Sequence, residues 1–534
     1  MVQSIQVLVV LLAVLAAAAL LAARLRIPPS ILLVLIGIAL ALVPGLPTVQ
    51  LAPEIMLLLV LPPLVYSAAV AMSWPEFRFN LRPISLLAIG CVLFTTLAAA
   101  AAAHWVLGLP WPLGFLLGAI ISPPDSVAPL AIARRMRLPR RILVILEGEG
   151  LADDATALIL YRFAVVAVSV GAFSLRHAVT SFLAVLVGEL VWGLAVGWLM
   201  LRLRRWVREP RIEITLSIIT PYLAYWPPEH LGGSGVLATV TAGLYISWNG
   251  LRLISSATRL QGVFFWDFLI YLIEGMVFLV TGLQARPLIA GIRGYSVWDL
   301  LDWAALVCAV VILARFVWMY PATYVPRWLS ASLRRRDPAP PWQWPFVLAF
   351  TGVRGVVSLA AALAIPLTTD SGAPFPQRNL ILFLTFAVIF VTLVGQGLAL
   401  PAVIRWLALA SAGDTERSEE REAEYAARRA AVQAALGRLE QIQQEHHIDP
   451  GEVQSLRERH LGRLAHAEQR IDGDKTHRRL SRRDEALEAM LIQAERERIN
   501  ELYRTGELKD EPRRRIEREL DLRDAQLANL REEP

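Results

Sequence analysis

Four carboxylates stand close together in segment 146–158, which reads L-E-G-E-G-L-A-D-D-A-T-A-L between apolar runs. They are Glu147, Glu149, Asp153 and Asp154. A carboxyl group in apolar surroundings can hold a proton near neutral pH and exchange it for a cation. In a helix, Glu149 and Asp153 would share one face, and Asp154 would point about 100° away from Asp153. These residues favour proton-coupled cation binding; the alternative is structural, with Glu147 as an interfacial cap and both aspartates in pairs.

Asp125 lies beside a predicted helix break. Segment 116–130 reads L-L-G-A-I-I-S-P-P-D-S-V-A-P-L, in which Pro123 and Pro124 have no backbone N–H to donate. A helix can break inside a membrane where it is buried in protein or lines a cavity, and the break frees carbonyls and helix ends that bind ions. The segment therefore indicates a second part of a binding site; the alternative is a plain proline kink with a solvated aspartate.

Two arginines stand alone in apolar sequence. Arg315 lies within V-C-A-V-V-I-L-A-R-F-V-W, and because a buried guanidinium is costly without a carboxylate, we expect it to have one as a partner. Arg354 lies between Gly352 and Gly355, which favours close helix packing or a second broken helix. The alternative for Arg354 is a side chain that extends to the membrane interface. Glu274 is a weaker candidate that fits an interface equally well.

The elements that must position these residues are long apolar runs, in a chain of 534 residues that is 56% hydrophobic with a mean hydropathy of +0.50. About twenty apolar residues span the hydrocarbon core of a bilayer. We count thirteen such runs, some short or interrupted: 4–24, 28–46, 53–72, 83–108, 112–134, 141–171, 175–201, 212–226, 233–248, 261–283, 297–324, 344–367 and 378–409. The composition predicts an all-α polytopic membrane protein with about thirteen transmembrane helices.

The placement of arginines predicts how the chain is oriented. The loops after odd-numbered runs hold 20 arginines, and the opposite loops hold 4. Cytoplasmic loops carry such an excess of basic residues. The N-terminus, which lacks the basic start of a signal peptide, is expected outside and the charged tail in the cytoplasm. The net charge of +6 thus follows from topology, and we expect no nucleic-acid partner.

The composition changes from apolar to charged after the last apolar run. We expect a transmembrane domain over 1–411 and a cytoplasmic tail over 412–534. The tail has helix breakers at Pro450-Gly451 and Gly473, and A-A-V-Q-A-A-L-G-R-L-E-Q-I has apolar residues at helical spacing. These features favour three or four amphipathic helices in a regulatory or dimerising module; a solvated, partly disordered appendage is the alternative.

The two interrupted runs, one with Asp125 and one with Arg354, are the fifth and the twelfth. Spans 4–6 and 11–13 therefore fit a pair of inverted three-span repeats. In secondary transporters, interrupted segments at equivalent places of two repeats point to a binding site between them.

Five segments carry a resemblance to a known family. They are 61–69 (L-P-P-L-V-Y-S-A-A), 118–128 (G-A-I-I-S-P-P-D-S-V-A), 146–158, 234–245 (S-G-V-L-A-T-V-T-A-G-L-Y) and 352–363 (G-V-R-G-V-V-S-L-A-A-A-L). Together they resemble the bacterial monovalent cation/proton antiporters related to NhaP-type and animal Na+/H+ exchangers. The resemblance implies a homodimer in which a core unit, with crossed discontinuous helices at spans 5 and 12, moves as an elevator against a dimerisation unit. It implies no cofactor.

The resemblance also implies roles for particular residues. By motif position, Asp154 looks like the family's ion- and proton-binding aspartate, and Asp125 like its partner at the helix break, so the monovalent cation is expected on these two. Glu149 and Arg315 match the family's buried salt bridge, and Arg354 matches the arginine of the span-12 crossing. The residues that we assign to ion or proton binding are Asp154, Asp125, Asp153, Pro124 and Ser122.

The chain departs from the family's pattern at several places. The family's usual run E-S-x-x-N-D falls on 149–154, where Gly150 removes a hydroxyl that could ligate the ion. Pro124 stands where a threonine is common, although its carbonyl remains usable. Ser67 stands where some relatives have a glutamate that gates or ligates.

Asp153 is the largest departure, because the family usually has asparagine there. Electrogenic relatives pair two aspartates with a lysine near the Arg315 position, whereas this chain has no lysine before Lys475. An electrogenic-looking Asp pair is thus combined with an electroneutral-looking Glu/Arg pair, which leaves the stoichiometry open. We expect Asp153 either to pair with Arg315 or to carry an extra proton.

The function that the resemblance implies is secondary antiport of Na+ against protons across the bacterial inner membrane, with K+ as the alternative cation and no enzymatic reaction. Two other classes remain open. A cation channel would need a continuous pore lined by carbonyls or rings of charge. A membrane-anchored sensor would carry its activity in the tail.

Overall fold

The computed structural model describes residues 2–25, 27–44, 55–170, 175–207, 209–250, 254, 256–292, 294–369, 372–446, 450–471 and short stretches between 487 and 525. Regular structure in these ranges is helical, and their β pairing is limited to one isolated bridge between Thr368 and Pro374. The predicted all-α fold is confirmed for the described chain. It divides into two compact units, Met1–Asp414 and Thr415–Pro534.

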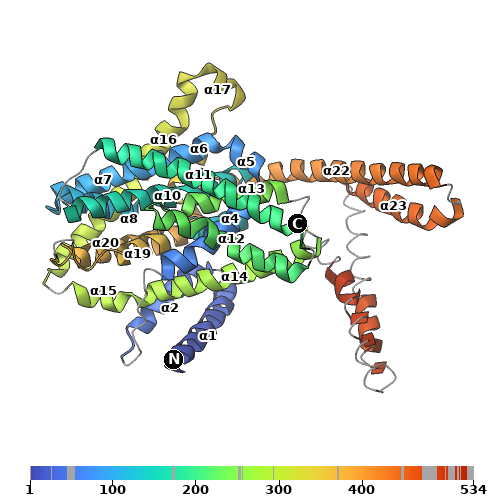
Figure 1. Cartoon of the computed structure of the whole chain (residues 1–534), viewed down its shortest axis with the longest axis horizontal. Helices are drawn as coiled ribbons and strands as arrows, with labels where there is room; N and C mark the ends of the chain where they lie inside the picture. The colour runs from blue at the N-terminus through green and yellow to red at the C-terminus, as the bar shows by residue number, and fades with distance from the viewer. Residues whose placement is uncertain are drawn as a thin grey trace. The chain divides into compact units, whose positions relative to one another are not determined.

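The first eleven helical elements cover the N-terminal part of the membrane domain (Figure 1). Segments marked η, two here and one in the second half, have the wider π-helical turn and continue directly into α-helix. The elements are α1 Val2–Leu25, α2 Pro29–Ala41, η1 Met56–Val60, α4 Leu61–Ala71, α5 Trp74–Phe79, α6 Leu81–Ser85, η2 Leu86–Cys91, α7 Val92–Trp105, α8 Trp111–Ile121, α9 Val127–Arg135 and α10 Arg140–Val170.

The remaining helices complete the membrane domain and enter the tail. They are α11 Leu175–Arg204, α12 Pro210–His230, α13 Val236–Gly250, α14 Ser256–Leu283, α15 Ala285–Gly291, α16 Val297–Leu329, α17 Ala331–Arg336, α18 Gln343–Phe350, α19 Val356–Leu363, α20 Arg378–Phe390, η3 Val391–Gln396, α21 Gly397–Trp406, α22 Leu409–His446 and α23 Pro450–Ile471.

The thirteen apolar runs each fall on one helix or on consecutive helices, but the count of thirteen membrane spans is not confirmed. Within the described residues, six helices are both long and apolar enough to cross a bilayer, and three apolar helices are shorter. The other helices miss these criteria because they are short, as α2, α8 and α13 are, or because they carry charged and polar residues, as α10 and α12 do. The six are Gln6–Leu25, Leu81–Trp105, Thr180–Arg204, Thr258–Ile289, Val297–Leu329 and Arg378–Trp406.

Helix α11 shows an apolar stripe on the outside of the first unit. Leu183, Val187, Val191, Leu194 and Trp198 follow one another at spacings of three or four residues, and each is exposed over about half of its surface. In a soluble protein such a stripe faces the core. An outward stripe of this kind fits a hydrocarbon surround, because lipid tails are as apolar as leucine.

Two helices are broken where the sequence predicted breaks. Helix α8 ends at Ile121 and α9 begins at Val127, with Pro123 and Pro124 in the gap. Helix α18 ends at Phe350 and α19 begins at Val356. Backbone donors and acceptors in both gaps therefore need partners outside their own helix.

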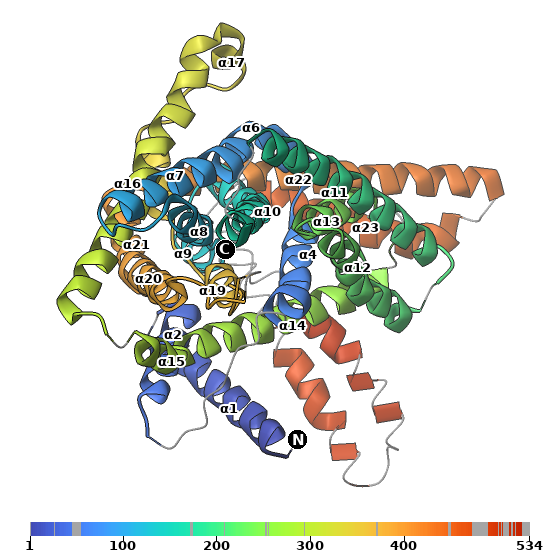
Figure 2. The same cartoon turned by 60° about the vertical axis from the view of Figure 1, so that its left-hand side comes forward.

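The two gaps meet each other. The backbone N–H of Asp125 in the first gap donates to the carbonyl of Val353 in the second at 2.6 Å. Figure 2 shows α8, α9 and α19 close together beside α10, and α10 packs against all three. The crossed, discontinuous helices expected at spans 5 and 12 are thus present, and α10 with its acids runs past their crossing.

The second unit is helical in its described part. It contains most of α22, all of α23 and further helical residues at 490–499 and 519–525. Its few buried apolar side chains include Val432, Val453, Ile492 and Leu520. Helices with so narrow an apolar face fit the amphipathic pattern predicted for the tail.

Candidate functional site

Helix α10 carries all four acids of segment 146–158 without interruption. Glu149 and Asp153 are enclosed, with 2% and 0% of their surface exposed, and Asp154 keeps 8%. Glu147 is less enclosed and pairs with Arg134 of α9 at 2.5 Å. The acids therefore have different partners, as their spacing around the helix requires.

Glu149 is paired with Arg315 of α16. The guanidinium donates from Nη1 and Nη2 to the two carboxylate oxygens at 2.6 and 2.7 Å, and its Nε donates to the carbonyl of Leu348 in α18 at 3.1 Å. Parallel hydrogen bonds of this kind are the strongest form of a charge pair. The structure thus gives the lone arginine of span 11 the carboxylate partner that its burial requires.

Asp153 does not pair with Arg315. One of its carboxyl oxygens accepts the backbone N–H of Asp154 at 2.8 Å. The other is buried and has no hydrogen-bond partner, and no ion pair in the described chain joins Asp153 to Arg315, which is directed to Glu149. One of the two predicted roles for Asp153 is therefore wrong, and the role as a proton carrier remains.

Two hydrogen bonds hold Asp125 at the crossing, and a glycine leaves room for its carboxylate. Besides the backbone bond to Val353, its carboxylate Oδ1 accepts the N–H of Val127, the first residue of α9, at 2.9 Å. A Cβ at position 355 would lie only 1.8 Å from Oδ2. Gly355 therefore leaves the space that the Asp125 carboxylate occupies, and no other residue could stand there without moving it.

Arg354 lies in the interior and does not extend to an interface. It is 1% exposed, and its Nε donates to the carbonyl of Ile121 at the end of α8 at 2.6 Å. Its Nη1 donates to the carbonyl of Gly352, and its backbone N–H donates to Oγ1 of Thr392 at 2.9 Å. The side chain thus satisfies carbonyls that both helix breaks leave without partners.

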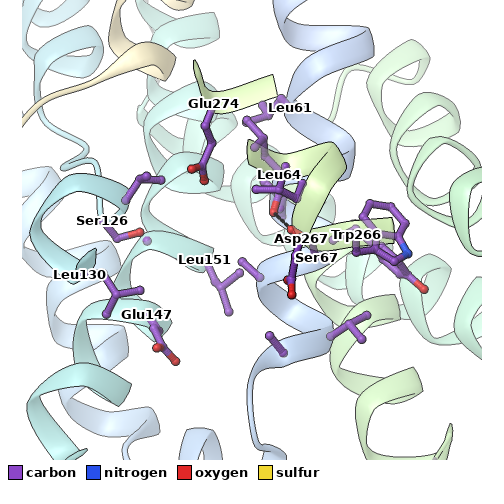
Figure 3. Close-up of a pocket in the computed structure, with 18 of the residues that line it drawn as sticks. Leu61, Leu64, Ser67, Ser126, Leu130, Glu147, Leu151, Trp266, Asp267 and Glu274 are labelled. Atoms are coloured by element: carbon purple, nitrogen blue, oxygen red, sulfur yellow. Dashed lines mark hydrogen bonds between the residues drawn. The ribbon is translucent and has the colours of Figure 1, made fainter. Parts of the chain in front are cut away.

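A cavity of about 870 Å³ lies against the crossing. Asp154 of α10 and Asp125 both line it, together with Pro124 in the α8–α9 gap. Ser67 of α4 and Glu274 of α14 line it as well, and Figure 3 shows the Glu274 carboxylate directed into the pocket. The two carboxylates predicted to hold a cation thus face one shared cavity.

Two of the residues assigned to ion or proton binding do not line this cavity. Ser122 is buried, and its hydroxyl donates to the carbonyl of Ala119 at 3.2 Å. A serine at the end of a helix often forms this hydrogen bond with a carbonyl of the preceding turn. The Ser122 hydroxyl therefore faces α8 and not the cavity. Asp153, as described above, faces the interior of the bundle.

Charged residues also line the cavity. They are Arg134, Arg204 and Arg259, with Glu147 and Glu213. The three arginines belong to loops or helix ends that the sequence predicts on the cytoplasmic side.

Sequence reasoning gave too little weight to two polar residues of the cavity. The sequence was interpreted as compatible with Glu274 at a membrane interface, yet the residue lies near the middle of the apolar helix Thr258–Ile289. Its central position in a long apolar run was the signal that could have found it. Ser126, the residue after Asp125, also lines the cavity, and nothing in its sequence neighbourhood distinguished it from Ser122.

Comparison with known families gives a match to most of the membrane domain. The family model described as "Sodium/hydrogen exchanger, transmembrane" matches residues 9–406. An uncharacterized Na+/H+ exchanger of Mycobacterium tuberculosis is 34% identical over 529 residues, which cover 98% of this chain and 96% of that protein. The similarity thus extends through the tail as well as the membrane domain.

Two further comparisons concern antiporters. The sodium, potassium, lithium and rubidium/H+ antiporter of Bacillus subtilis is 33% identical over 390 residues, covering 70% of this chain and 57% of that protein. The solved structure of the sodium/proton antiporter MjNhaP1 of Methanocaldococcus jannaschii superposes with a TM-score of 0.62 at 20% identity. It covers 76% of this chain and 99% of the solved chain, so the two share a fold.

Proposed function

From the premise that this chain belongs to the sodium/hydrogen exchanger family, we propose that Asp154 and Asp125 together bind the exchanged cation and the proton. The chain is a multi-pass membrane antiporter that exchanges a monovalent cation, Na+ above all, for protons, and it is not an enzyme. The observation that carries the residue assignment is the cavity on which both carboxylates open.

The geometry supports a competition between cation and proton for one site. Asp154 comes from a continuous helix and Asp125 from a helix break, so the two carboxylates approach the cavity from different elements. An empty site would carry unneutralised negative charge, which crosses a low-dielectric barrier poorly. A cation or protons remove that charge, so only a loaded site changes sides. Exchange therefore falls at acid pH, where protons keep the cation out.

The first test replaces the carboxylate and keeps its shape. Asp154→Asn in proteoliposomes is expected to abolish cation-driven proton movement, read by dequenching of a pH dye on adding Na+. Asp302→Asn, an exposed acid of α16 outside the cavity, is the matched control and should exchange normally. Undiminished exchange by the Asp154 variant would overturn the assignment.

Na+ is our first choice of cation, and K+ is the second. The Bacillus subtilis relative is named for sodium, potassium, lithium and rubidium, which shows that relatives of this chain are not restricted to Na+. Carboxylate, hydroxyl and carbonyl oxygens serve all of these ions. Dequenching measured ion by ion, with and without a clamped membrane potential, would give the selectivity and the charge moved in each cycle.

The two alternative classes, a channel and a sensor, are each distinguished from an antiporter by a different measurement. A channel would conduct the cation without moving protons, whereas an antiporter drives proton movement that saturates with cation concentration. A sensor with its activity in the tail would lose its function on deletion of 415–534, and that deletion should leave exchange in place if the membrane domain suffices.

We propose a homodimer in the bacterial inner membrane, with the N-terminus outside and the tail in the cytoplasm. The apolar stripe of α11 supports a surface available to lipid or to a second copy, and the arginine-rich loops support the orientation. The native mass of the purified protein tests the dimer. Labelling of single cysteines placed at Gly294 and Arg336, in loops predicted on opposite sides, tests the orientation.

A further inference from the structure

Ser126 is a cavity residue whose side chain is pressed against α10. A Cβ at position 150 of α10 would lie 2.4 Å from the Ser126 Oγ and 2.8 Å from its Cβ. The absence of a side chain at Gly150 is therefore what allows Ser126 to reach this helix. The contact fixes the serine hydroxyl at one turn of α10.

That turn is the one before Asp154. Positions 150 and 154 are i and i+4, so they share a helix face, with about 5–6 Å between neighbouring Cβ positions. Ser126 also follows Asp125 directly in the chain, and all three residues line the same cavity. Figure 3 shows the Ser126 hydroxyl among the side chains that surround the pocket. An ion held between the two aspartates thus lies within reach of this hydroxyl.

The Ser126 hydroxyl differs from three other serine hydroxyls of the membrane domain. Those of Ser67, Ser122 and Ser217 each donate to a carbonyl three residues earlier, at 3.0, 3.2 and 2.6 Å. The Ser126 Oγ makes no hydrogen bond within the described chain, although its own backbone carbonyl accepts the N–H of Leu130. The residue lines the cavity, and no donor in the described chain occupies the lone pairs of this hydroxyl.

A monovalent cation at this site requires such neutral oxygens. In the described chain no group of three or more His, Cys, Asp or Glu side chains is placed to hold a metal ion. The two carboxylates therefore supply the charge, and further ligands must come from hydroxyls, carbonyls or water. A hydroxyl supplies lone pairs without adding charge.

We propose that the Ser126 hydroxyl is a ligand of the transported cation, together with Asp154 and Asp125. This rests on the proposed function, because it completes the same site. The close approach at Gly150 holds the hydroxyl in place, so the ligand comes from the α8–α9 break and not from α10.

The first experiment separates affinity from folding. Ser126→Ala is expected to raise the KM for Na+ about tenfold, equivalent to about 1.4 kcal/mol of binding, with the maximal exchange rate within about twofold. Ser217→Ala is the matched control, because this serine lines the same cavity but its hydroxyl is already bonded to the carbonyl of Ile214. Its KM should not change. An unchanged KM in the Ser126 variant would overturn the proposal.

A second arm excludes a general effect of cavity polarity. Ser358 of α19 lines the cavity too, and its buried hydroxyl has no hydrogen-bond partner, but nothing ties it to α10. Ser358→Ala is expected to leave the KM for Na+ within about twofold of the wild-type value. A KM that rises as much as in Ser126→Ala would overturn a specific role for Ser126.

A third arm moves the hydroxyl across the contact. Gly150→Ser alone would place a Cβ against Ser126 and should lose activity or stability. Ser126→Gly with Gly150→Ser removes both clashing atoms and restores one hydroxyl from α10. The double variant is expected to recover a KM within about threefold of wild type, well below that of Ser126→Gly. No recovery in a folded double variant would contradict the proposal.

Binding is also read without transport. Na+ should raise the thermal unfolding midpoint of the purified full chain, with a half-saturating concentration that rises about tenfold in Ser126→Ala. Asp154→Asn is assayed in parallel. If it still exchanges, the proposed function fails; if it is inactive while Ser126→Ala keeps the wild-type KM and half-saturation, only the role of Ser126 fails.

Discussion

Glu149 and Arg315 stand 166 positions apart in the chain and meet in the interior through two hydrogen bonds of 2.6 and 2.7 Å. Each side chain is only 2% exposed. Two charges removed from water in this way stabilise a fold only while both are present, since either one alone is a buried, uncompensated charge. The pair therefore joins α10, which carries the acids, to α16 and α18.

Arg315→Met is expected to lower the free energy of unfolding by about 3–5 kcal/mol. The double variant with Glu149→Met leaves no unpaired charge, so it should recover more than half of that loss. Thermal unfolding of the purified protein in detergent, for wild type, both single variants and the double, measures the coupling. Additive losses in the double variant would show that the two side chains act independently.

Gly355→Ala is expected to lower exchange about 100-fold, because the added Cβ must displace the Asp125 carboxylate by more than an ångström. Gly395→Ala is the control, since a Cβ at position 395 has no atom within 4 Å. Initial rates in proteoliposomes measure both. Wild-type exchange by Gly355→Ala would mean that the Asp125 position is unimportant.

Asp153→Asn is expected to keep exchange but to change its response to membrane potential. The amide oxygen can still accept the Asp154 N–H, whereas the second oxygen, which has no partner, loses its ability to carry a proton. Rates with and without a clamped potential measure the charge moved. An unchanged voltage dependence would rule out the extra proton.

Asp337, in the loop between α17 and α18, gives a pH prediction. Burial raises the pKa of its carboxyl, but hydrogen bonding and attraction from Arg141, and attraction from Arg327 and Arg82, lower it by more, so the pKa lies below the usual 3.8. The nearest N–O distances to these arginines are 2.8, 2.7 and 2.8 Å. The ionised carboxylate thus stabilises the fold above the unfolded pKa, and this stabilisation is lost as pH falls through the folded pKa.

Asp337→Asn is therefore expected to lower the unfolding midpoint at pH 7 by about 2 °C. The difference from wild type should shrink between about pH 5 and about pH 3, as the wild-type carboxyl becomes protonated. Unfolding curves across that range test it, with Asp302→Asn as a control of equal charge change. A difference that grows on acidification would contradict the sign.

Much of the fold and several candidate site residues were accessible from the sequence. Charged residues inside apolar runs are costly, so Asp154, Glu149 and Arg315 were conspicuous, and Pro123 and Pro124 indicated the break beside Asp125. That Arg315 would have a carboxylate partner followed from the cost of leaving it alone, and the resemblance to the family implied that this partner is Glu149. Each of the signals from charges and prolines lies within one apolar run, so it can be recognised without knowing how the helices pack.

What the sequence could not give was the direction of individual side chains. Ser122 and Ser126 flank the same Pro-Pro-Asp stretch, yet one hydroxyl turns back to α8 and the other reaches Gly150 on α10. Only the packing of the break against α10 decides this. The place of Glu274 likewise depends on which face of α14 the cavity covers. Of the two alternatives for Asp153, the structure shows no pair with Arg315, whose guanidinium is bound to Glu149.

The size of the cavity determines whether a cation can still be hydrated when it reaches the aspartates. A volume of about 870 Å³ corresponds to roughly thirty water molecules at liquid density. A cavity of this size can hold a cation together with its hydration shell, so dehydration is required only beside Asp125 and Asp154. Discrimination among alkali ions then weighs the cost of removing that shell against the oxygens that replace it. The same space, within the range that drug-sized ligands occupy, is large enough for an organic inhibitor.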